Sequence, residues 1–155
     1  MKVGDVMTRK VITISENQSK EQAARLLARH RISGLPVIDK DGVLVGVVTE
    51  FDVIAKDGTT VGAIMTRGII SVTPETELDA ASHILVHEHI RRLPVLDQGR
   101  LVGIVSRADV VRIVAMRWIC SVCGEVTYGE SPPESCPRCG ALELPAASEQ
   151  EPPGS

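Results

Sequence analysis

The chain has 155 residues, 43% of them hydrophobic, and a formal net charge of −3. This length suits one domain, or one modest domain with a small appendage, and the apolar content is sufficient for a core. No apolar run reaches the roughly 18 residues of a membrane helix, and the charge shows no basic excess that would suit nucleic acid. We therefore predict a cytoplasmic protein that binds neither a membrane nor nucleic acid.

Residues 1–116 contain the same sequence unit twice, and we place the two copies at 1–58 and 59–116. The opening "VGDVMTRKVITIS" from Val3 recurs as "VGAIMTRGIISVT" from Val61. Later, "ISGLPVIDKDGVLVGVVTEFDV" recurs as "IRRLPVLDQGRLVGIVSRADV", which is one residue shorter in its central turn. Such self-similarity indicates a repeated fold unit.

Each copy predicts the same elements in chain order: a strand, a helix, two strands joined by a tight turn, and a closing helix. In the first copy these are a strand at 11–14, a helix at 19–30, strands at 35–38 and 44–48, and a short helix from Asp52. The second copy repeats the plan, with helix 77–88, strands 93–96 and 101–105, and helix 109–116. One unit has too small an apolar face to fold alone, so we predict that the copies pack their sheets together as one α/β (α+β) body.

The repeated motifs closely resemble the cystathionine β-synthase (CBS) domain pair, or Bateman module. The resemblance rests on the doubled "GVVTEFD" and "GIVSRAD", the doubled "ISGLPV" and "IRRLPV", and the leading "DVMT" and "AIMT". It implies two clefts that bind an adenosine nucleotide (AMP, ADP or ATP) and a homodimer formed through the CBS pairs. For the dimer surface we predict the small residues of the two longer helices, at 23–27 and 81–85.

The resemblance also implies which residues form each cleft. The first cleft would use Asp109, Ser106, Arg91 and Arg92, with Ser15 near the base; the second would use Asp52 and Thr49, with Thr73 near the base. An Asp at a helix start can accept hydrogen bonds from a ribose diol, while a nearby Ser or Thr and backbone N–H groups face the phosphate. The alternative is that both Asp residues serve only as helix N-caps.

The two predicted clefts differ in charge. Arg91 and Arg92 precede "LPV" in the second repeat, where the first repeat has Ser33 and Gly34. Glu50 follows Thr49, whereas an Arg follows Ser106. Because Arg can bind phosphate through charge-assisted hydrogen bonds and Glu cannot, we expect the Asp109 cleft to be the stronger one.

All four cysteines lie in two Cys-x-x-Cys pairs near the C-terminus, at Cys120 and Cys123 and at Cys136 and Cys139. A glycine follows each pair, as in tight knuckles whose backbone N–H groups face thiolate sulfur. Without a secretion signal, this spacing favours one tetrahedral metal ion per chain, iron or zinc, over two disulfides. A segment this short needs the metal in order to fold.

The sequence motifs "WICSVCG" and "GESPPESCPRCGA" resemble the rubredoxin-like domain that ends rubrerythrins, and the resemblance covers residues 117–144. It is also similar to short zinc ribbons, which use the same knuckles. The Glu-x-x-His pairs of a di-iron bundle are absent upstream, so peroxidase activity is not implied. The tail at 145–155 is rich in Pro, Ser and Glu and is predicted to be disordered.

The sequence contains no recognisable set of catalytic residues. We interpret His83 and His87 as part of a solvent-exposed helix face. We therefore predict a non-enzymatic regulatory protein that senses an adenosine nucleotide. Its metal-bound ribbon would transmit the signal as the output domain or would contact an unknown protein partner. The alternative is a redox protein in which an iron ribbon carries electrons and the CBS pair regulates or docks it. The ribbon segment from residue 117 carries six acidic and two basic residues, which disfavours a nucleic-acid regulator.

Overall fold

The computed structural model describes residues 1–142, and the predicted disordered tail at 145–155 lies outside this range. The chain forms two compact units, Met1–Ser106 and a second that begins at Arg107. In the described range, no helix is long and apolar enough to cross a membrane.

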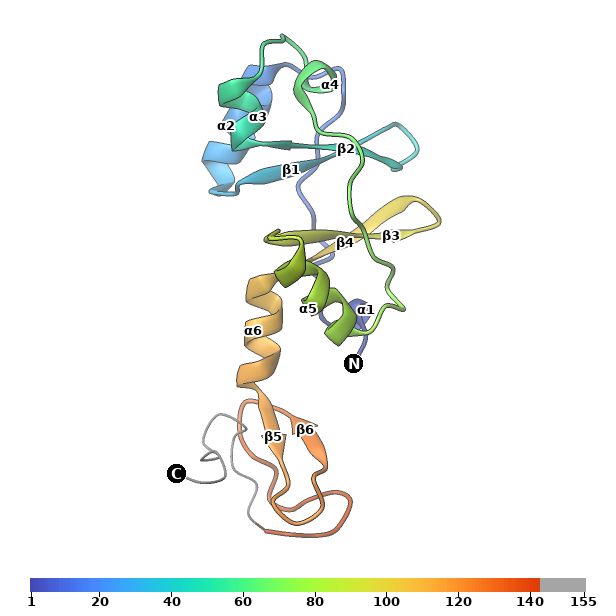
Figure 1. The fold of residues 1–155 in the computed structure, drawn as a ribbon, viewed down its shortest axis with the longest axis vertical. Coiled ribbons are helices and arrows are strands. Elements are labelled where there is room, and N and C mark those ends of the chain that lie inside the picture. Colours follow the sequence, from blue (N-terminus) through green and yellow to red (C-terminus); the bar gives the residue numbers. More distant parts are fainter. Residues whose placement is uncertain (143–155) are drawn as a thin grey trace. The chain divides into compact units, whose positions relative to one another are not determined.

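The first unit contains the first repeat and the second repeat as far as Ser106, each with one antiparallel hairpin (Figure 1). Its elements in chain order are α1 (Val3–Val6), α2 (Lys20–His30), β1 (Gly34–Ile38), β2 (Leu44–Thr49), α3 (Glu50–Ala55), α4 (Val61–Ile64), α5 (Leu78–His87), β3 (Arg92–Asp97) and β4 (Arg100–Ser106). The hairpins β1–β2 and β3–β4 and the helices α2, α3 and α5 confirm the elements predicted for these segments. The second unit holds α6 (Arg107–Ala115) and the hairpin β5 (Arg117–Ile119) and β6 (Val126–Tyr128).

Turn chemistry explains the difference in length between the two hairpins of the first unit. In the first hairpin, Oδ1 of Asp39 accepts the N–H groups of Asp41 and Val43, and Gly42 adopts a φ of 79°. In the second, Gln98 and Gly99 both have positive φ, as a two-residue turn with right-handed strand twist requires. The shorter loop therefore keeps the same strand pairing.

The strand predicted at 11–14 is wrong, because only Ile14 pairs with β1. Its N–H donates to the carbonyl of Pro36, and the N–H of Ile38 donates to the carbonyl of Ile14. The next bond of a parallel ladder would need an N–H on Pro36, which proline lacks. Val72 meets the same limit beside Pro94 in the second repeat.

Two four-residue helices, α1 and α4, were not predicted, and each packs on the other repeat (Figure 1). The N–H of Val3 donates to Thr76 O at 2.8 Å, and the segment after α1 bridges Thr8 to Ile104 of β4. Conversely, the N–H of Val61 donates to Gln18 O at 2.8 Å. The segment after α4 bridges Thr66 to Val47 of β2. The leading segment of each repeat thus completes the sheet of its neighbour.

Small aliphatic side chains build the core of the first unit. Leu35, Val37 and Val48 from the hairpin pack with Ala23 and Leu27 of α2, and Val61 and Ile64 of α4 join the same cluster. In the second repeat Ala81 and Leu85 of α5 are buried as well. The prediction that the residues at 23–27 and 81–85 form a dimer surface is therefore wrong for these four side chains, because they face the protein's own core.

Candidate functional site

A cavity of about 390 Å³ lies within the first unit and is lined by both repeats. This volume falls in the range of small-molecule sites. Much of the wall is apolar and comes from Pro36, Val47, Ile69, Ile70, Pro94 and Ile104. An aromatic base fits such a wall because it removes apolar surface from water.

The polar part of the wall carries two arginines and three hydroxyl groups. Arg91 and Arg92 stand at the start of β3, opposite Ser33, Thr49 and Thr66. Nη1 of Arg92 donates to Oγ of Ser33 at 3.4 Å, a long hydrogen bond that joins the two repeats. The residues that line the cavity include no Asp or Glu. The wall therefore carries a positive charge that no lining carboxylate offsets.

Asp52 lies behind this wall and is 1% exposed. It is the third residue of α3, and Thr49 is the N-cap, so the alternative that Asp52 itself is the N-cap is wrong. Oδ1 of Asp52 pairs with Nζ of Lys56 at 2.7 Å, and Oδ2 accepts the N–H and hydroxyl of Thr49 at 2.9 and 3.0 Å. Burial opposes ionisation of Asp52, but the Lys56 ammonium and the Thr49 hydrogen bonds outweigh it and lower the pKa of the carboxyl.

The structure brings Arg91, Arg92 and Thr49 to one cavity, although the sequence analysis assigned the arginines and Thr49 to different clefts. Ser15 and Thr73 do not line it; their N–H groups donate to Gln18 Oε1 and Thr76 Oγ1 in the turns before α2 and α5.

The other predicted cleft residues also lie outside this cavity. Ser106 ends β4, opposite Arg92 in the hairpin. Asp109 stands in the first turn of α6, where Oδ1 pairs with Arg112 at 3.2 Å.

Sequence reasoning missed Thr66, which lines the cavity and donates to the Asp52 carboxylate at 3.3 Å. The signal for it was the "MT" dipeptide that recurs at Met7 and Met65. Thr66 lies beside the hairpin of the first repeat because the leading segment of the second repeat packs on the first repeat. The sequence does not reveal this exchange of segments.

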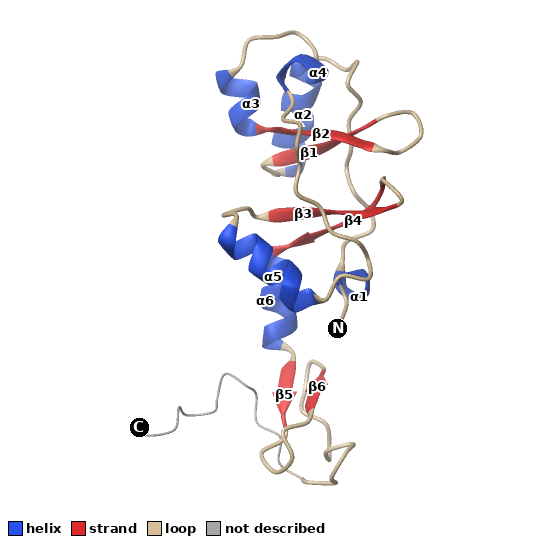
Figure 2. Cartoon of the chain, turned by 45° about the vertical axis from the view of Figure 1, so that its right-hand side comes forward, coloured by secondary structure: helices blue, strands red, loops and turns tan. Residues whose placement is uncertain are grey.

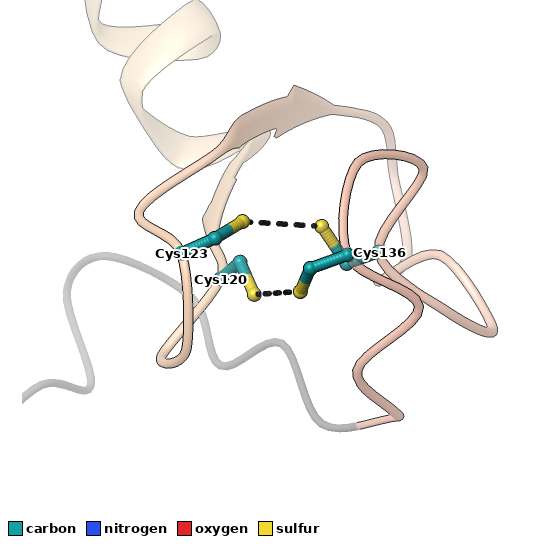
Figure 3. Close-up of side chains that lie close together, drawn as sticks. Cys120, Cys123 and Cys136 are labelled. Atoms are coloured by element: carbon teal, nitrogen blue, oxygen red, sulfur yellow. Dashed lines mark hydrogen bonds between the residues drawn. The ribbon is translucent and has the colours of Figure 1, made fainter.

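The second unit brings all four cysteines together (Figure 3). Their sulfur atoms lie within 4.8 Å of one another, and the pairs Cys120–Cys139 and Cys123–Cys136 are 3.6 Å apart. These distances exclude disulfide bonds of about 2.05 Å. They fit a tetrahedron in which each sulfur is about 2.3 Å from a central zinc, which sets sulfurs about 3.8 Å apart.

Two equivalent knuckles create this geometry. The N–H of Gly124 donates to Cys120 O and that of Gly140 to Cys136 O, both at 2.9 Å. Both glycines have positive φ, near 78°. The backbone then turns its N–H groups toward the sulfurs; that of Arg138 donates to Cys136 Sγ at 3.4 Å.

The four sulfurs differ in their hydrogen bonding. The N–H groups of Cys123 and Val122 lower the pKa of Cys120 to about 6, and those of Cys139 and Arg138 lower the pKa of Cys136. Cys123 and Cys139 each gain one favourable backbone N–H, but burial and the neighbouring sulfurs raise their pKa. Four thiolates this close repel one another, so the donor set fits a cation that supplies the missing positive charge.

Trp118 packs against the cysteine cluster, and its indole N–H donates to Gly129 O at 3.0 Å. Tyr128 is 45% exposed, so the aromatic cover of the cysteine cluster comes from Trp118. Cys120 and Cys136 are buried, whereas Cys139 is exposed. The cysteine cluster is thus open to its surroundings on the Cys139 side.

Fold and sites together define a class: two packed repeats with a cavity lined by both, followed by a small domain that clusters four cysteines. The CBS domain model matches residues 3–57 and 61–116, and the chain belongs to the CBS domain family. The model of the rubredoxin-like domain of rubrerythrin matches residues 118–143, so the C-terminal segment is a rubredoxin-like domain of the rubrerythrin type. Both resemblances seen in the sequence are confirmed.

Known proteins match the CBS region. The CBS domain-containing protein YhcV of Bacillus subtilis is 38% identical over 114 residues, which are 69% of this chain and 81% of YhcV. A homoserine O-acetyltransferase of Methanococcoides burtonii is 36% identical over 116 residues, 72% of this chain but only 24% of that enzyme.

Solved CBS pairs superpose on the same region. The CBSX2 structure in complex with AMP has a TM-score of 0.69 and 36% identity, covering 72% of this chain and 93% of CBSX2. The CBS pair of MJ0100, solved with 5-methylthioadenosine and S-adenosyl-L-methionine, has a TM-score of 0.66 and 34% identity, covering 72% of this chain and 94% of the pair.

Proposed function

We propose that this chain is a non-enzymatic cytoplasmic regulator whose CBS pair binds an adenosine nucleotide in the cavity between its repeats. The observation that carries the proposal is the cavity wall, which joins an apolar surface to Arg91 and Arg92. A nucleotide needs both features, one for its base and one for its phosphate. The AMP and adenosyl ligands of the CBSX2 and MJ0100 structures support the same ligand class.

AMP, ADP or ATP is expected to stabilise the first unit against unfolding. A ligand that binds only the folded state at 100 times its Kd adds about 2.7 kcal/mol to the free energy of unfolding. Thermal unfolding followed by far-UV circular dichroism, with and without each nucleotide, measures this. An unchanged midpoint with all three nucleotides up to millimolar concentration contradicts the proposal.

The cleft at Ser106 and Asp109, which the resemblance implied, stays a prediction. The two cavity arginines favour the Thr49 side as the stronger site, which reverses the order expected from the sequence. Substituting Asp109→Ala measures the share of the second cleft in any stabilisation.

For the ribbon we propose one iron or zinc ion held by Cys120, Cys123, Cys136 and Cys139. Iron in such a site exchanges one electron, whereas zinc serves as a structural staple. Elemental analysis and a visible spectrum of protein from iron-replete cells separate the two. A red protein that dithionite bleaches reversibly favours the redox alternative; a colourless protein with one zinc per chain favours a staple and a partner contact.

We also propose that the CBS pairs form a homodimer through α3 and not through the buried faces of α2 and α5. Phe51 and Ile54 of α3 are 70% and 84% exposed, and their spacing of three residues places both on one face of the helix. The double substitution Phe51→Glu/Ile54→Glu is expected to convert the dimer to monomer in light scattering, because it buries charge at the interface. Val86→Glu, at an exposed position of α5, is the matched control and should leave the dimer intact. A monomer for the natural chain at micromolar concentration contradicts the dimer.

A further inference from the structure

We propose that His83 and His87 of α5 form a further metal site, which chelates a divalent transition ion (Ni²⁺, Cu²⁺ or Zn²⁺) through the two imidazole rings. The site lies in the second repeat and shares no residue with the tetracysteine cluster or with the wall of the cavity. It goes beyond the proposed function, because it depends neither on a nucleotide nor on the ion of the ribbon.

The spacing of the two histidines places them one turn apart on the same face of α5. Residues at i and i+4 of a helix have their Cβ atoms about 5–6 Å apart. The imidazole rings of His83 and His87 stack on each other, with centroids 5.5 Å apart and ring planes at 9°. Both side chains are exposed, as the sequence interpretation expected. An ion can therefore reach both rings from solvent.

Chelation requires the two rings to tilt toward each other. Imidazole nitrogens lie about 2.0–2.1 Å from a bound zinc, so two nitrogens on one tetrahedral ion are about 3.3 Å apart. The torsion that turns a histidine ring has broad energy wells, so such a tilt costs little in an exposed side chain. The rings can thus move from the stack to a shared ion without any change in the helix.

The first repeat shows that the fold does not require histidine at these positions. The equivalent residues, 58 positions earlier in α2, are Arg25 and Arg29, which are exposed as well. Arg is the better helix former, but its guanidinium stays protonated and cannot coordinate a metal. The second repeat therefore has weaker helix formers at two exposed positions, and these two side chains are metal ligands at a chelating spacing.

The type and number of ligands define the class of ion. Imidazole suits zinc, copper and nickel, whereas Mg²⁺ and Ca²⁺ prefer oxygen ligands. In the described range, the cysteine cluster is the one group that brings three or more ligand side chains together, so this site offers two protein ligands and water completes the shell. Asp79, an exposed residue one turn before His83, adds negative charge to the same face. We expect an ion that exchanges with solvent.

Calorimetric titration of the untagged full chain with NiCl₂, after its ribbon has been saturated with zinc, tests the proposal. Ni²⁺ is the probe because imidazole binds it well and the thiolates are already occupied. We expect saturable binding of one Ni²⁺ per chain. His83→Asn and His87→Asn should each weaken this binding by about tenfold or more, because loss of even an outer-shell partner of a metal site costs 10–100-fold.

The other two histidines of the chain, His30 and His89, provide matched controls, since both are exposed and neither is four residues from another histidine. His30→Asn and His89→Asn should leave the Ni²⁺ affinity unchanged. The double substitution His83→Arg/His87→Arg installs the residues of the first repeat. It should abolish the binding while the far-UV circular dichroism of the chain stays the same.

A second measurement locates the ion, because paramagnetic Ni²⁺ broadens the amide signals of residues near it. We expect the ¹⁵N–¹H signals of residues 83–87 to lose intensity first. The proposal is overturned if the double substitution leaves the Ni²⁺ affinity unchanged, if a control variant loses it, or if the broadening is centred outside α5. It is also overturned if the natural chain binds no Ni²⁺ up to millimolar concentration. None of these results bears on nucleotide binding.

Discussion

Removing the proposed metal is expected to unfold the rubredoxin-like ribbon and to leave the two CBS repeats folded. The buried cluster of the described ribbon consists of Cys120 and Cys136, with Trp118 partly buried against them, so we expect metal binding, about 10 kcal/mol or more, to supply most of its folding free energy. Trp118 is the one tryptophan of the chain, and its fluorescence reports on the ribbon alone. We expect a strong chelator under reducing conditions to shift its emission to the red while far-UV circular dichroism retains most of its helical signal.

Substituting Cys136→Ser should reproduce this state without chelator, because three thiolates with a serine bind the ion far more weakly. Ser135→Ala, next to that ligand, is the matched control and should keep both the metal and the native emission. An emission spectrum that chelation leaves unchanged, in protein shown to be metal-free, contradicts the proposal that the ion holds the ribbon together.

Substituting Met7→Ala should lower the free energy of unfolding by about 2–5 kcal/mol, the usual cost of truncating a buried methionine. Met7 follows α1 in the first repeat but covers Gly103 in β4 of the second. A Cβ added at Gly103 would lie 2.6 Å from Met7 Sδ and 3.0 Å from Thr8 O. Gly103→Val should therefore cost about 1–3 kcal/mol through overpacking.

The two positions should couple. Gly103→Ala is expected to cost less in the Met7→Ala background than in the natural chain, by about 0.5–3 kcal/mol, because the crowded sulfur is gone. The matching pair, Met65 of the second repeat over Gly46 of the first, has the same geometry, with Sδ 2.7 Å from a Cβ at Gly46, and gives an internal replicate. Strictly additive costs in urea unfolding would mean that the leading segments do not cross between the repeats.

The hairpins and longer helices were predictable because local chemistry specifies them. Alternating Val and Leu around Asp/Gly turns predicted the strands, and Ser19 before an apolar 3.6-residue pattern predicted α2. The short helices α1 and α4 were not predictable, since four residues carry too little periodicity. The false strand at 11–14 followed from reading Val and Ile without the missing N–H of Pro36 on the partner strand.

The tetracysteine site and the cavity likewise differ in how far the sequence could predict them. The tetracysteine site is made of two local knuckles, so the spacing of Cys120, Cys123, Cys136 and Cys139 contained nearly all of its geometry. The cavity depends on tertiary structure, because the crossing of leading segments brings Thr66 to Asp52. Motif matching alone therefore assigned Arg91 and Arg92 to one cleft and Thr49 to another, and gave no sign of the contact between Thr66 and Asp52.

The proposed function depends most on the cavity between the repeats being the nucleotide site. The direct measurement is an AMP titration of the ¹⁵N-labelled, zinc-loaded full chain followed by amide chemical shifts. We predict saturable shifts concentrated at the cavity wall, at Thr49, Thr66, Ile69 and Arg92, with the ribbon amides around Cys136 unmoved. Shifts confined to other residues, or no saturable shifts at millimolar AMP, would contradict the account.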